Sequence, residues 1–286
     1  MAVCNVCFRH CSIEEGKTGF CGARKCADGR VVCGNYGRIT SAALDPIEKK
    51  PLARFCPGSL VLSVGSYGCN LRCPFCQNSE ISWSAEALAS GRDDGTYGGL
   101  PYDLVPPEKL ADLAEEYKDK GNIGVAFTYN EPLIGWEYVR DAAKLVHERG
   151  MKNVLVTNGT ASRDVFDAVS PYIDAMNIDL KGFTKRYYDD LIGGDFGMTK
   201  EFIQSAVKTC HVELTTLIIP GENDSEDEMR DMCAWIAALD PETPLHISRF
   251  FPAFHMTDRA PTDVGLIYRL ADVAREYLKY VYTGNC

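Results

Sequence analysis

Short apolar runs alternate with amphipathic stretches along the chain after residue 58. This alternation is typical of βαβ units and predicts a parallel sheet. The six predicted strands lie at residues 60–66, 123–129, 153–158, 175–181, 212–219 and 245–250. Helices are predicted most clearly at 108–120, 136–149, 226–239 and 263–277, and the apolar residues 280–282 can add a strand at the edge of the sheet.

Six β/α units are fewer than the eight of a closed barrel. We therefore expect an α/β fold of the incomplete (β/α)6 type, splayed open, with the carboxyl ends of its strands facing a cleft. Chemistry in barrel folds is carried by the loops after the strands. The polar residues that follow the predicted strands are accordingly the candidates for a site.

The first 57 residues have a different composition, with seven of the thirteen cysteines and no long apolar periodicity. They predict a small cysteine-rich, metal-stapled module at 1–57, followed by the partial barrel at 58–286. Residues 84–105 form a long connection with several glycines. Such a connection is either a mobile surface loop or a lid over the cleft.

The charge and cysteine content restrict the class of protein. A formal net charge of −10 argues against nucleic acid or an anionic membrane surface as the main partner. No apolar run reaches the roughly 18 residues of a membrane span, and the N-terminus lacks signal-peptide features, so we expect a cytoplasmic protein. Thirteen cysteines in that compartment indicate metal ligation or reduced thiols, because disulfides belong to oxidising environments.

Cys69, Cys73 and Cys76 have C-x3-C-x2-C spacing directly after the first predicted strand. Iron-sulfur cubes usually take four thiolates, so a loop that offers three leaves one iron for another ligand. A zinc site or buried apolar thiols are the alternatives. Short zinc loops usually show paired C-x2-C knuckles, which favours the iron-sulfur cluster here.

The triplet resembles the signature of the radical S-adenosylmethionine (SAM) superfamily. The resemblance implies a [4Fe-4S] cluster whose fourth iron is chelated by the amino and carboxylate groups of SAM. It also implies that an electron from a flavodoxin or ferredoxin-type donor splits the sulfonium into methionine and a 5′-deoxyadenosyl radical. Cys69, Cys73 and Cys76 are then both the metal ligands and the catalytic residues.

The loop after the second predicted strand contains Tyr129, Asn130 and Glu131. It resembles the position of the Gly-Gly-Glu motif that binds the amino group of SAM in this superfamily. A carboxylate at Glu131 is suited to accept charge-assisted hydrogen bonds from that group. The alternative is an ordinary turn residue before Pro132.

Later strand ends supply further candidates for SAM binding. Resemblance to glycyl-radical activases implies that Thr157 and Asn158 hold the ribose, and that Asp179 and Lys181 lie near the sulfonium and the carboxylate. Lys181 fits as a point charge, while an Asp-Lys pair that caps the strand is the alternative. Ser248 and Arg249 lie at the end of the sixth predicted strand and are expected to contact the adenosine or methionine end of SAM.

Five segments together, residues 45–51, 68–78, 128–132, 179–181 and 248–250, resemble the AmmeMemoRadiSam-system radical SAM enzymes, relatives of pyruvate formate-lyase activating enzyme. Cys4, Cys7, Cys11 and Cys21 fit the same family and have the composition of a four-thiolate site. Zinc is the simplest occupant, because a small module without a core needs a staple. An auxiliary iron-sulfur cluster and free thiols are the alternatives.

The motifs leave the substrate open. One hypothesis is an activase that takes hydrogen from a glycine of a partner enzyme. A second is a modifying or metabolic enzyme that acts on a protein or small molecule with the partners of the AmmeMemoRadiSam system. A third, from another class, is a non-catalytic metal-binding interaction protein.

Overall fold

The computed structural model describes residues 1–82, 96–97 and 100–286. The greater part of the predicted lid at 84–105 lies outside the described residues. Among those residues, no helix is long and apolar enough to cross a membrane.

An eight-stranded sheet forms the centre of the molecule, in the order β16-β15-β14-β13-β12-β11-β7-β6. Neighbouring strands from β7 to β16 pair in parallel, while β6 pairs antiparallel to β7 at one edge. The bounds are β6 Ser41–Pro46, β7 Leu60–Gly65, β11 Asn122–Phe127, β12 Lys152–Thr157, β13 Ala175–Asp179, β14 His211–Ile218, β15 Leu245–Arg249 and β16 Val281–Gly284. The sheet is linear in order and does not close, so the predicted incomplete barrel is confirmed.

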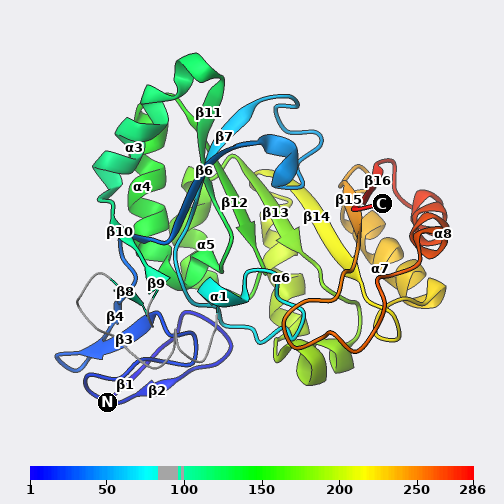
Figure 1. Ribbon diagram of the computed structural model, residues 1–286, viewed down its shortest axis with the longest axis horizontal. Coiled ribbons are helices and arrows are strands. Elements are labelled where there is room, and N and C mark those ends of the chain that lie inside the picture. The colour runs from blue at the N-terminus through cyan, green and yellow to red at the C-terminus, as the bar shows by residue number, and fades with distance from the viewer. Residues whose placement is uncertain (83–95, 98–99) are drawn as a thin grey trace.

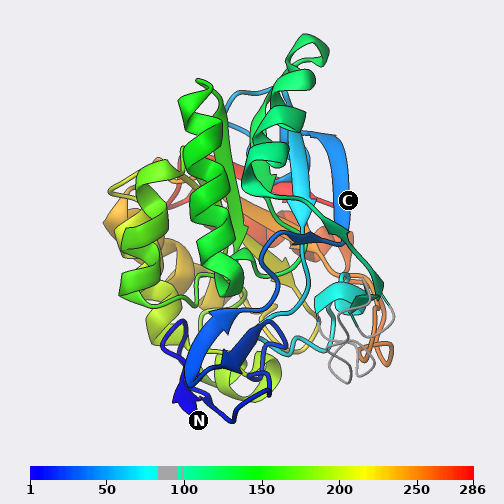
Figure 2. The same cartoon turned by 90° about the vertical axis from the view of Figure 1, so that its left-hand side faces the viewer.

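Six of the described helices cover the outer face of the curved sheet (Figures 1 and 2). They are α3 Pro107–Glu116, α4 Trp136–Glu148, α5 Arg163–Val169, α6 Phe196–Ala206, α7 Glu226–Leu239 and α8 Val264–Arg275. The short α1 Ser79–Ser82 lies at the carboxyl ends of the strands, and a π-helix spans Tyr187–Ile192. The buried side of α4, with Val139, Ala142 and Val146, belongs to the main hydrophobic core together with Leu155 of β12. The large apolar area removed from water between helices and sheet is the main stabilising term.

Helix ends follow the capping signals of the sequence. The Ser225 side chain caps α7 by accepting from the N–H of Glu228, and Asp263 caps α8 by accepting from the N–H of Leu266. Each cap satisfies a backbone donor that the first turn leaves without an intrahelical partner. The predicted start of α7 at residue 226 is therefore confirmed.

The inside of the barrel has a floor at the amino ends of the strands. Ile47 and Leu52, which precede β7, are fully buried against Val61, Ala126 and Val154. This segment lies at the end of the sheet away from α1 (Figure 1). The barrel is thereby closed at one end and can open on a cavity only at the other.

Buried Glu213 of β14 holds this floor in place. Its carboxylate accepts hydrogen bonds from the backbone N–H of Ala53 and Arg54 at 2.9 and 2.8 Å. It also bonds His211 and His246 at 2.9 and 2.6 Å. Burial opposes ionisation, but these hydrogen bonds outweigh it and lower the pKa of Glu213 to about 2.

The first forty residues form short antiparallel pairs. β1 (Ala2–Val3) pairs with β2 (Ser12–Ile13), β3 (Arg24–Ala27) pairs with β4 (Arg30–Cys33), and β5 (Arg38–Ile39) pairs with β10 (Asp103–Leu104). β8 (Thr96–Tyr97) pairs with β9 (Leu100–Pro101). β1 to β4 lie at the same end of the sheet as α1 (Figures 1 and 2). A division of the chain at residue 57 stays a prediction, and the sheet itself takes in β6, which precedes that residue.

Candidate active site

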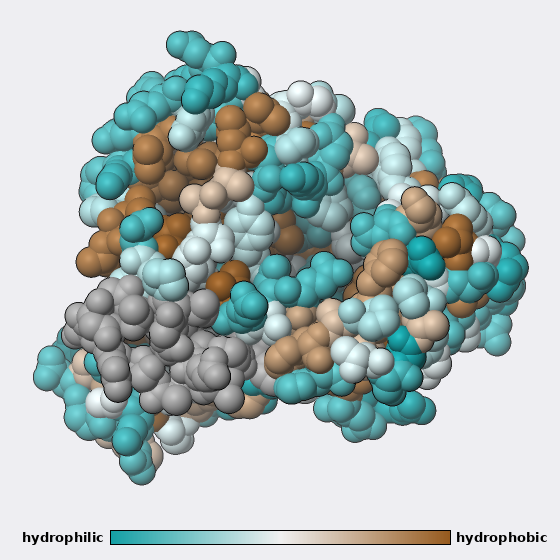
Figure 3. Space-filling view, in the orientation of Figure 1, coloured by the Kyte–Doolittle hydropathy of each residue, from teal (hydrophilic) through white to brown (hydrophobic). Residues whose placement is uncertain are grey.

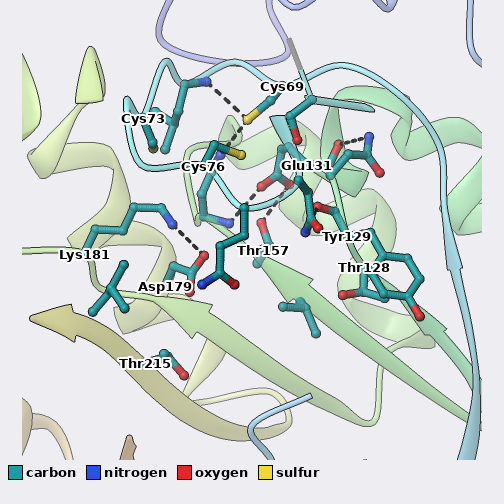
Figure 4. A pocket seen from close by; sticks show the side chains of 18 of the residues that line it. Cys69, Cys73, Cys76, Thr128, Tyr129, Glu131, Thr157, Asp179, Lys181 and Thr215 are labelled. Atoms are coloured by element: carbon teal, nitrogen blue, oxygen red, sulfur yellow. Dashed lines mark hydrogen bonds and ion pairs between the residues drawn. The ribbon is translucent and has the colours of Figure 1, made fainter. Parts of the chain in front are cut away.

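A cavity of about 360 Å³ opens at the carboxyl ends of the parallel strands. Its walls come from the loop after β7 and from the ends of β11, β12, β13, β14 and β15 (Figure 4). The predicted site residues on its wall are Cys69, Cys73, Cys76, Tyr129, Asn130, Glu131, Thr157, Asn158, Asp179, Lys181 and Ser248. On the face seen in the space-filling view, the hydrophobic residues gather over α3, α4 and β11, away from the predicted site residues (Figure 3).

The three cluster cysteines lie together in the loop between β7 and α1, which we call the cluster loop (residues 68–78) (Figure 4). Burial raises the pKa of Cys69 well above its usual value and that of Cys73 to about 12. The free thiols are therefore protonated at neutral pH, and iron binding must displace those protons. Three adjacent thiols on one wall fit a cube that takes its fourth ligand from the cavity.

Among the described residues, no three histidine, cysteine, aspartate or glutamate side chains are already arranged as ligands of a single ion. This holds for the cluster cysteines as for the rest. Metal loading is thus expected to draw the thiolates closer together than the free thiols lie.

Glu131 lies at the start of the turn after β11 and is only 3% exposed. Its carboxylate accepts hydrogen bonds from the N–H of Leu133 at 3.0 Å, the hydroxyl of Thr157 at 2.8 Å and the N–H of Asn158 at 2.8 Å. Burial nevertheless raises its pKa to about 7. A cavity ligand with N–H donors would stabilise the ionised form, because one acceptor position of the carboxylate is still available.

The two residues before Glu131 tie the end of β11 to the cluster loop and to β6. Asn130 accepts from the N–H of Ser66 at 3.0 Å and donates to the carbonyl of Gly68 at 3.0 Å. Tyr129 adopts a left-handed backbone with φ of 71°, and its hydroxyl donates to Asp45 at 2.8 Å. A strained non-glycine residue at this position is typical of a functional strand end.

Thr157 and Asn158 link Glu131 to the cluster loop from β12. The Asn158 amide donates to Asn70 Oδ1 at 2.9 Å and approaches Cys69 Sγ at 3.8 Å. The hydroxyl of Thr157 is already engaged with Glu131. Their contact with the ribose therefore stays a prediction. The bonds seen here show that the two residues position Glu131 and the cluster loop.

Asp179 and Lys181 face the cavity and form an ion pair of 2.8 Å (Figure 4). Burial disfavours the ammonium, but the charge of Asp179 and its hydrogen bond raise the pKa of Lys181 well above its usual value. Lys181 is thus a permanent positive charge in the cavity, next to the cluster cysteines.

The two residues predicted at the end of β15 separate. Ser248 lines the cavity, while the Arg249 guanidinium donates to the carbonyl of Thr262 at 2.7 Å and does not line it. Successive side chains of a strand point to opposite faces, so both cannot face the same cavity. The predicted contact of Arg249 with SAM has no support from this position.

Among the residues of the cavity wall that sequence reasoning did not assign to the site, two carry a charge, Lys49 and Lys50. Lys50 is buried and pairs with Asp45 at 2.9 Å, and Lys49 pairs with the same carboxylate at 3.2 Å. Two lysines and one aspartate leave a net positive charge. The motif at residues 45–51 was visible in the sequence, but its approach to the cavity depends on the antiparallel pairing of β6 with β7.

The four N-terminal cysteines lie apart from this cavity. Cys4, Cys7, Cys11 and Cys21 line a separate small cavity that Asn70 of the cluster loop also reaches. All thirteen cysteines of the chain are free thiols. The cysteines predicted as one group are thus brought together.

A partial α/β barrel with three cysteines after its first parallel strand defines a class, the enzymes that bind an iron-sulfur cluster and SAM at the open end of the barrel. The Radical SAM superfamily matches residues 63–233. This chain belongs to the radical SAM superfamily. The cluster and SAM are accordingly its expected cofactors, and it needs a reductant and a substrate.

Curated relatives agree with that membership. The chain is 36% identical to the uncharacterized protein MJ0808 of Methanocaldococcus jannaschii, over 99% of this chain and 80% of that protein. It is 26% identical to pyruvate formate-lyase 1-activating enzyme of Escherichia coli, over 56% of this chain and 61% of that enzyme. The relation to the activating enzymes is therefore distant.

Solved structures share the fold. Streptococcus suis SuiB bound to S-adenosylmethionine has a TM-score of 0.58 at 14% identity, covering 80% of this chain and 52% of that chain. QueE from Escherichia coli has a TM-score of 0.51 at 12% identity, covering 86% and 92%. At these identities the likeness supports the fold alone.

Proposed function

We propose that this protein reductively cleaves SAM and directs the resulting 5′-deoxyadenosyl radical to abstract a hydrogen atom from a substrate. The observation that carries the proposal is the convergence of three cluster cysteines, Glu131 and Lys181 on one cavity. When bound, the [4Fe-4S] cluster supplies the electron and SAM supplies the radical. The protein's own task is to bind, orient and exclude water.

Each wall of the cavity has a distinct part in this proposal. Cys69, Cys73 and Cys76 would hold the cluster through three thiolates on the cavity wall. Glu131 accepts hydrogen bonds from the amino group of SAM, and Lys181 places its positive charge against the carboxylate. Phe75, which is buried beside the cluster cysteines, shields the cluster from water.

The test is anaerobic reconstitution with iron, sulfide, SAM and dithionite, followed by chromatography of the products. We expect 5′-deoxyadenosine and methionine in equal amounts from the wild type and none from Cys76→Ala. Cys210→Ala, which lies outside both cysteine groups, is the matched control and keeps the activity. Absence of 5′-deoxyadenosine from a fully iron-loaded wild type contradicts the proposal and favours a non-catalytic metal-binding protein.

An activase that takes hydrogen from a glycine of a partner enzyme is one candidate for the finer function. Its support is the similarity to pyruvate formate-lyase activating enzymes and to 4-hydroxyphenylacetate decarboxylase activating enzyme of Clostridioides difficile, 24% identical over 120 residues. A glycyl-radical doublet in the spin-resonance spectrum of a co-purified partner is the expected result. A radical that stays on SAM-derived products argues against it.

A reaction within the AmmeMemoRadiSam system is the second candidate. Lys49 and Lys50, which line the cavity, belong to a segment outside the matched superfamily region of residues 63–233. A substrate with an anionic group suits this wall. Addition of the partner proteins of that system should stimulate 5′-deoxyadenosine formation in the wild type, and a Lys49→Ala variant should lose the stimulation while it keeps the basal rate.

The electron donor and the compartment follow from the same chemistry. A flavodoxin or ferredoxin-type protein is the proposed reductant, because the cluster requires a low-potential electron. Thirteen free thiols are consistent with a reducing compartment such as the cytoplasm.

A further inference from the structure

Four cysteines of the N-terminal region, which we call the cysteine tetrad (Cys4, Cys7, Cys11 and Cys21), line one cavity of about 10 Å³. Cys4, Cys7 and Cys21 are 5%, 8% and 6% exposed. A space of this size accommodates about one atom. Among the residues that the structure describes no ligand set is already arranged around one ion, so an ion bound here would draw the four sulfurs together around this space.

A backbone donor already points at one sulfur of the tetrad. The N–H of Arg24 donates to Cys21 Sγ at 3.4 Å. Arg9 and Asn70 line the same cavity beside Cys7. The tetrad is therefore enclosed by residues that belong both to the N-terminal region and to the cluster loop.

A buried arginine next to the tetrad lacks part of its hydrogen bonding. Arg24 is 4% exposed and lines the same cavity. Its Nη1 donates to Glu137 at 2.6 Å, but its buried Nε has no partner among the described residues. A buried N–H without an acceptor costs about 1–3 kcal/mol. A metal bound by four thiolates carries a net negative charge, and its sulfurs would supply the acceptor that Nε lacks.

We infer that the cysteine tetrad holds one tetrahedral zinc ion and that this ion seats the cluster loop of the active site. Four thiolates in a small module select zinc over harder divalent ions. The ion would add folding free energy to a region built from pairs of very short strands. This metal binding is independent of SAM cleavage, whereas the seating of the cluster loop rests on the proposed function.

The cluster loop packs directly on the tetrad. Gly68 has a left-handed φ of 89°, and a Cβ atom there would lie 2.4 Å from the carbonyl oxygen of Cys21. Asn70 is buried between the two sites, since it contacts Cys7 on one side and accepts from Asn158 at 2.9 Å on the other. Loss of the ion would therefore loosen the surface on which Cys69 is held.

Two arginines, Arg9 and Arg72, stabilise the contact between the N-terminal region and the cluster loop. The Nε of Arg9 donates to the carbonyl of Asn70 at 2.6 Å. Arg72 of the cluster loop donates to the carbonyl of Phe20 at 2.5 Å. Both guanidinium groups stack on the Phe20 ring, at 3.3 and 4.0 Å from its centre. The tetrad and the cluster loop thus form one packed unit.

Metal analysis of a variant with all three cluster cysteines changed to alanine tests the site by itself. We expect one zinc per chain and no iron-sulfur absorbance after anaerobic purification. The further substitutions Cys4→Ala and Cys7→Ala in this triple variant should remove the zinc. The control substitutions Cys210→Ala and Cys233→Ala should leave it bound. Residual iron-sulfur absorbance, or zinc that survives the Cys4/Cys7 change, overturns the inference.

A second variant avoids the loss of ligands, because removal of cysteines can unfold the module. Arg24→Met keeps all four thiols and should weaken zinc binding at least tenfold in competition with a chromogenic chelator. Arg140→Met, which removes an arginine paired with Asp141 on α4, is the control and should bind zinc as the wild type does. Equal affinity in the two variants contradicts the role of Arg24 and of the anionic centre.

The link between the two sites is tested in the protein with its cluster cysteines intact. Zinc is removed by chelation and the protein is then reconstituted with iron and sulfide. We expect iron loading to fall at least twofold and to recover when zinc is added first. Equal loading with and without zinc overturns the seating role. Because iron content is the readout, this result does not depend on whether SAM is cleaved.

Discussion

The pH dependence of SAM binding is the sharpest consequence of the buried Glu131. Burial raises the pKa of this carboxyl to about 7. Such a group is about one-tenth ionised at pH 6 and about nine-tenths ionised at pH 8. If the ionised form accepts the hydrogen bonds of the SAM amino group, affinity should rise about tenfold over this range, which corresponds to ~1.4 kcal/mol.

Glu131→Gln isolates this effect. The variant keeps the size of the side chain and removes its titration, so its SAM affinity should lack the tenfold rise. Lys181 stays charged throughout, because its pKa is raised well above the usual value. Among the described residues no histidine lines the cavity to add a second titration. The amino group of SAM also titrates near pH 8, but it does so equally in both proteins and cancels in their ratio.

The assay is anaerobic titration of the reduced cluster with SAM, followed by spin resonance at several pH values and constant ionic strength. Circular dichroism checks the fold, because the glutamine amide leaves one buried donor without its acceptor at a cost of about 1–3 kcal/mol. Identical pH slopes for wild type and variant would refute the reasoning. A flat wild-type profile would do the same.

Two further predictions concern buried charges. Lys181→Met should raise the Kd for SAM about 10- to 100-fold, because a charge-assisted hydrogen bond of about 1.5–3 kcal/mol is lost. The control is Lys185→Met, which changes an exposed lysine paired with Asp189. Equal SAM affinities in the two variants would contradict the role of Lys181. Glu213→Gln should lower the free energy of unfolding by about 3 kcal/mol at pH 7, because the folded pKa of about 2 lies below the ordinary 4.5. This contribution to stability is present above pH 4.5 and is lost as the pH falls towards 2. Urea denaturation at pH 3 should therefore show less than half of the pH 7 difference in unfolding free energy between wild type and Glu213→Gln. A difference that does not change with pH would contradict the link to the ionisation of Glu213.

The sheet was largely predictable because parallel strands are buried on both faces and read as continuous apolar runs. All six predicted strands are present, and β16 confirms the expected addition at the edge. β6 was missed because its small and polar residues are partly exposed along an edge strand. The π-helix at Tyr187–Ile192 was not predicted, because the apolar pattern was compared only with the periods of an α-helix and a strand.

The site was predictable where local spacing carries the chemistry, as in Cys69, Cys73 and Cys76. It was less predictable where contacts come from distant segments. Lys49 reaches the cavity only because β6, which precedes it, pairs with β7. Arg249 was predicted as a site residue, although successive side chains of a strand point to opposite faces and Ser248 already faces the cavity. The hydrogen bonds that occupy Glu131 and Thr157 also depend on the parallel register of β11 and β12.

The floor of the barrel constrains the order in which the chain can fold. Ala53 hydrogen-bonds Glu213 across a sequence separation of 160 residues. Contacts of such high sequence separation slow folding, because a long loop must close before they form. During synthesis the apolar side chains of Ile47 and Leu52 emerge long before Ala126, Val154 and Ala175, which cover them in the folded protein. The nascent chain therefore carries a partly uncovered hydrophobic segment that chaperones can bind until the fourth parallel strand, β13, leaves the ribosome.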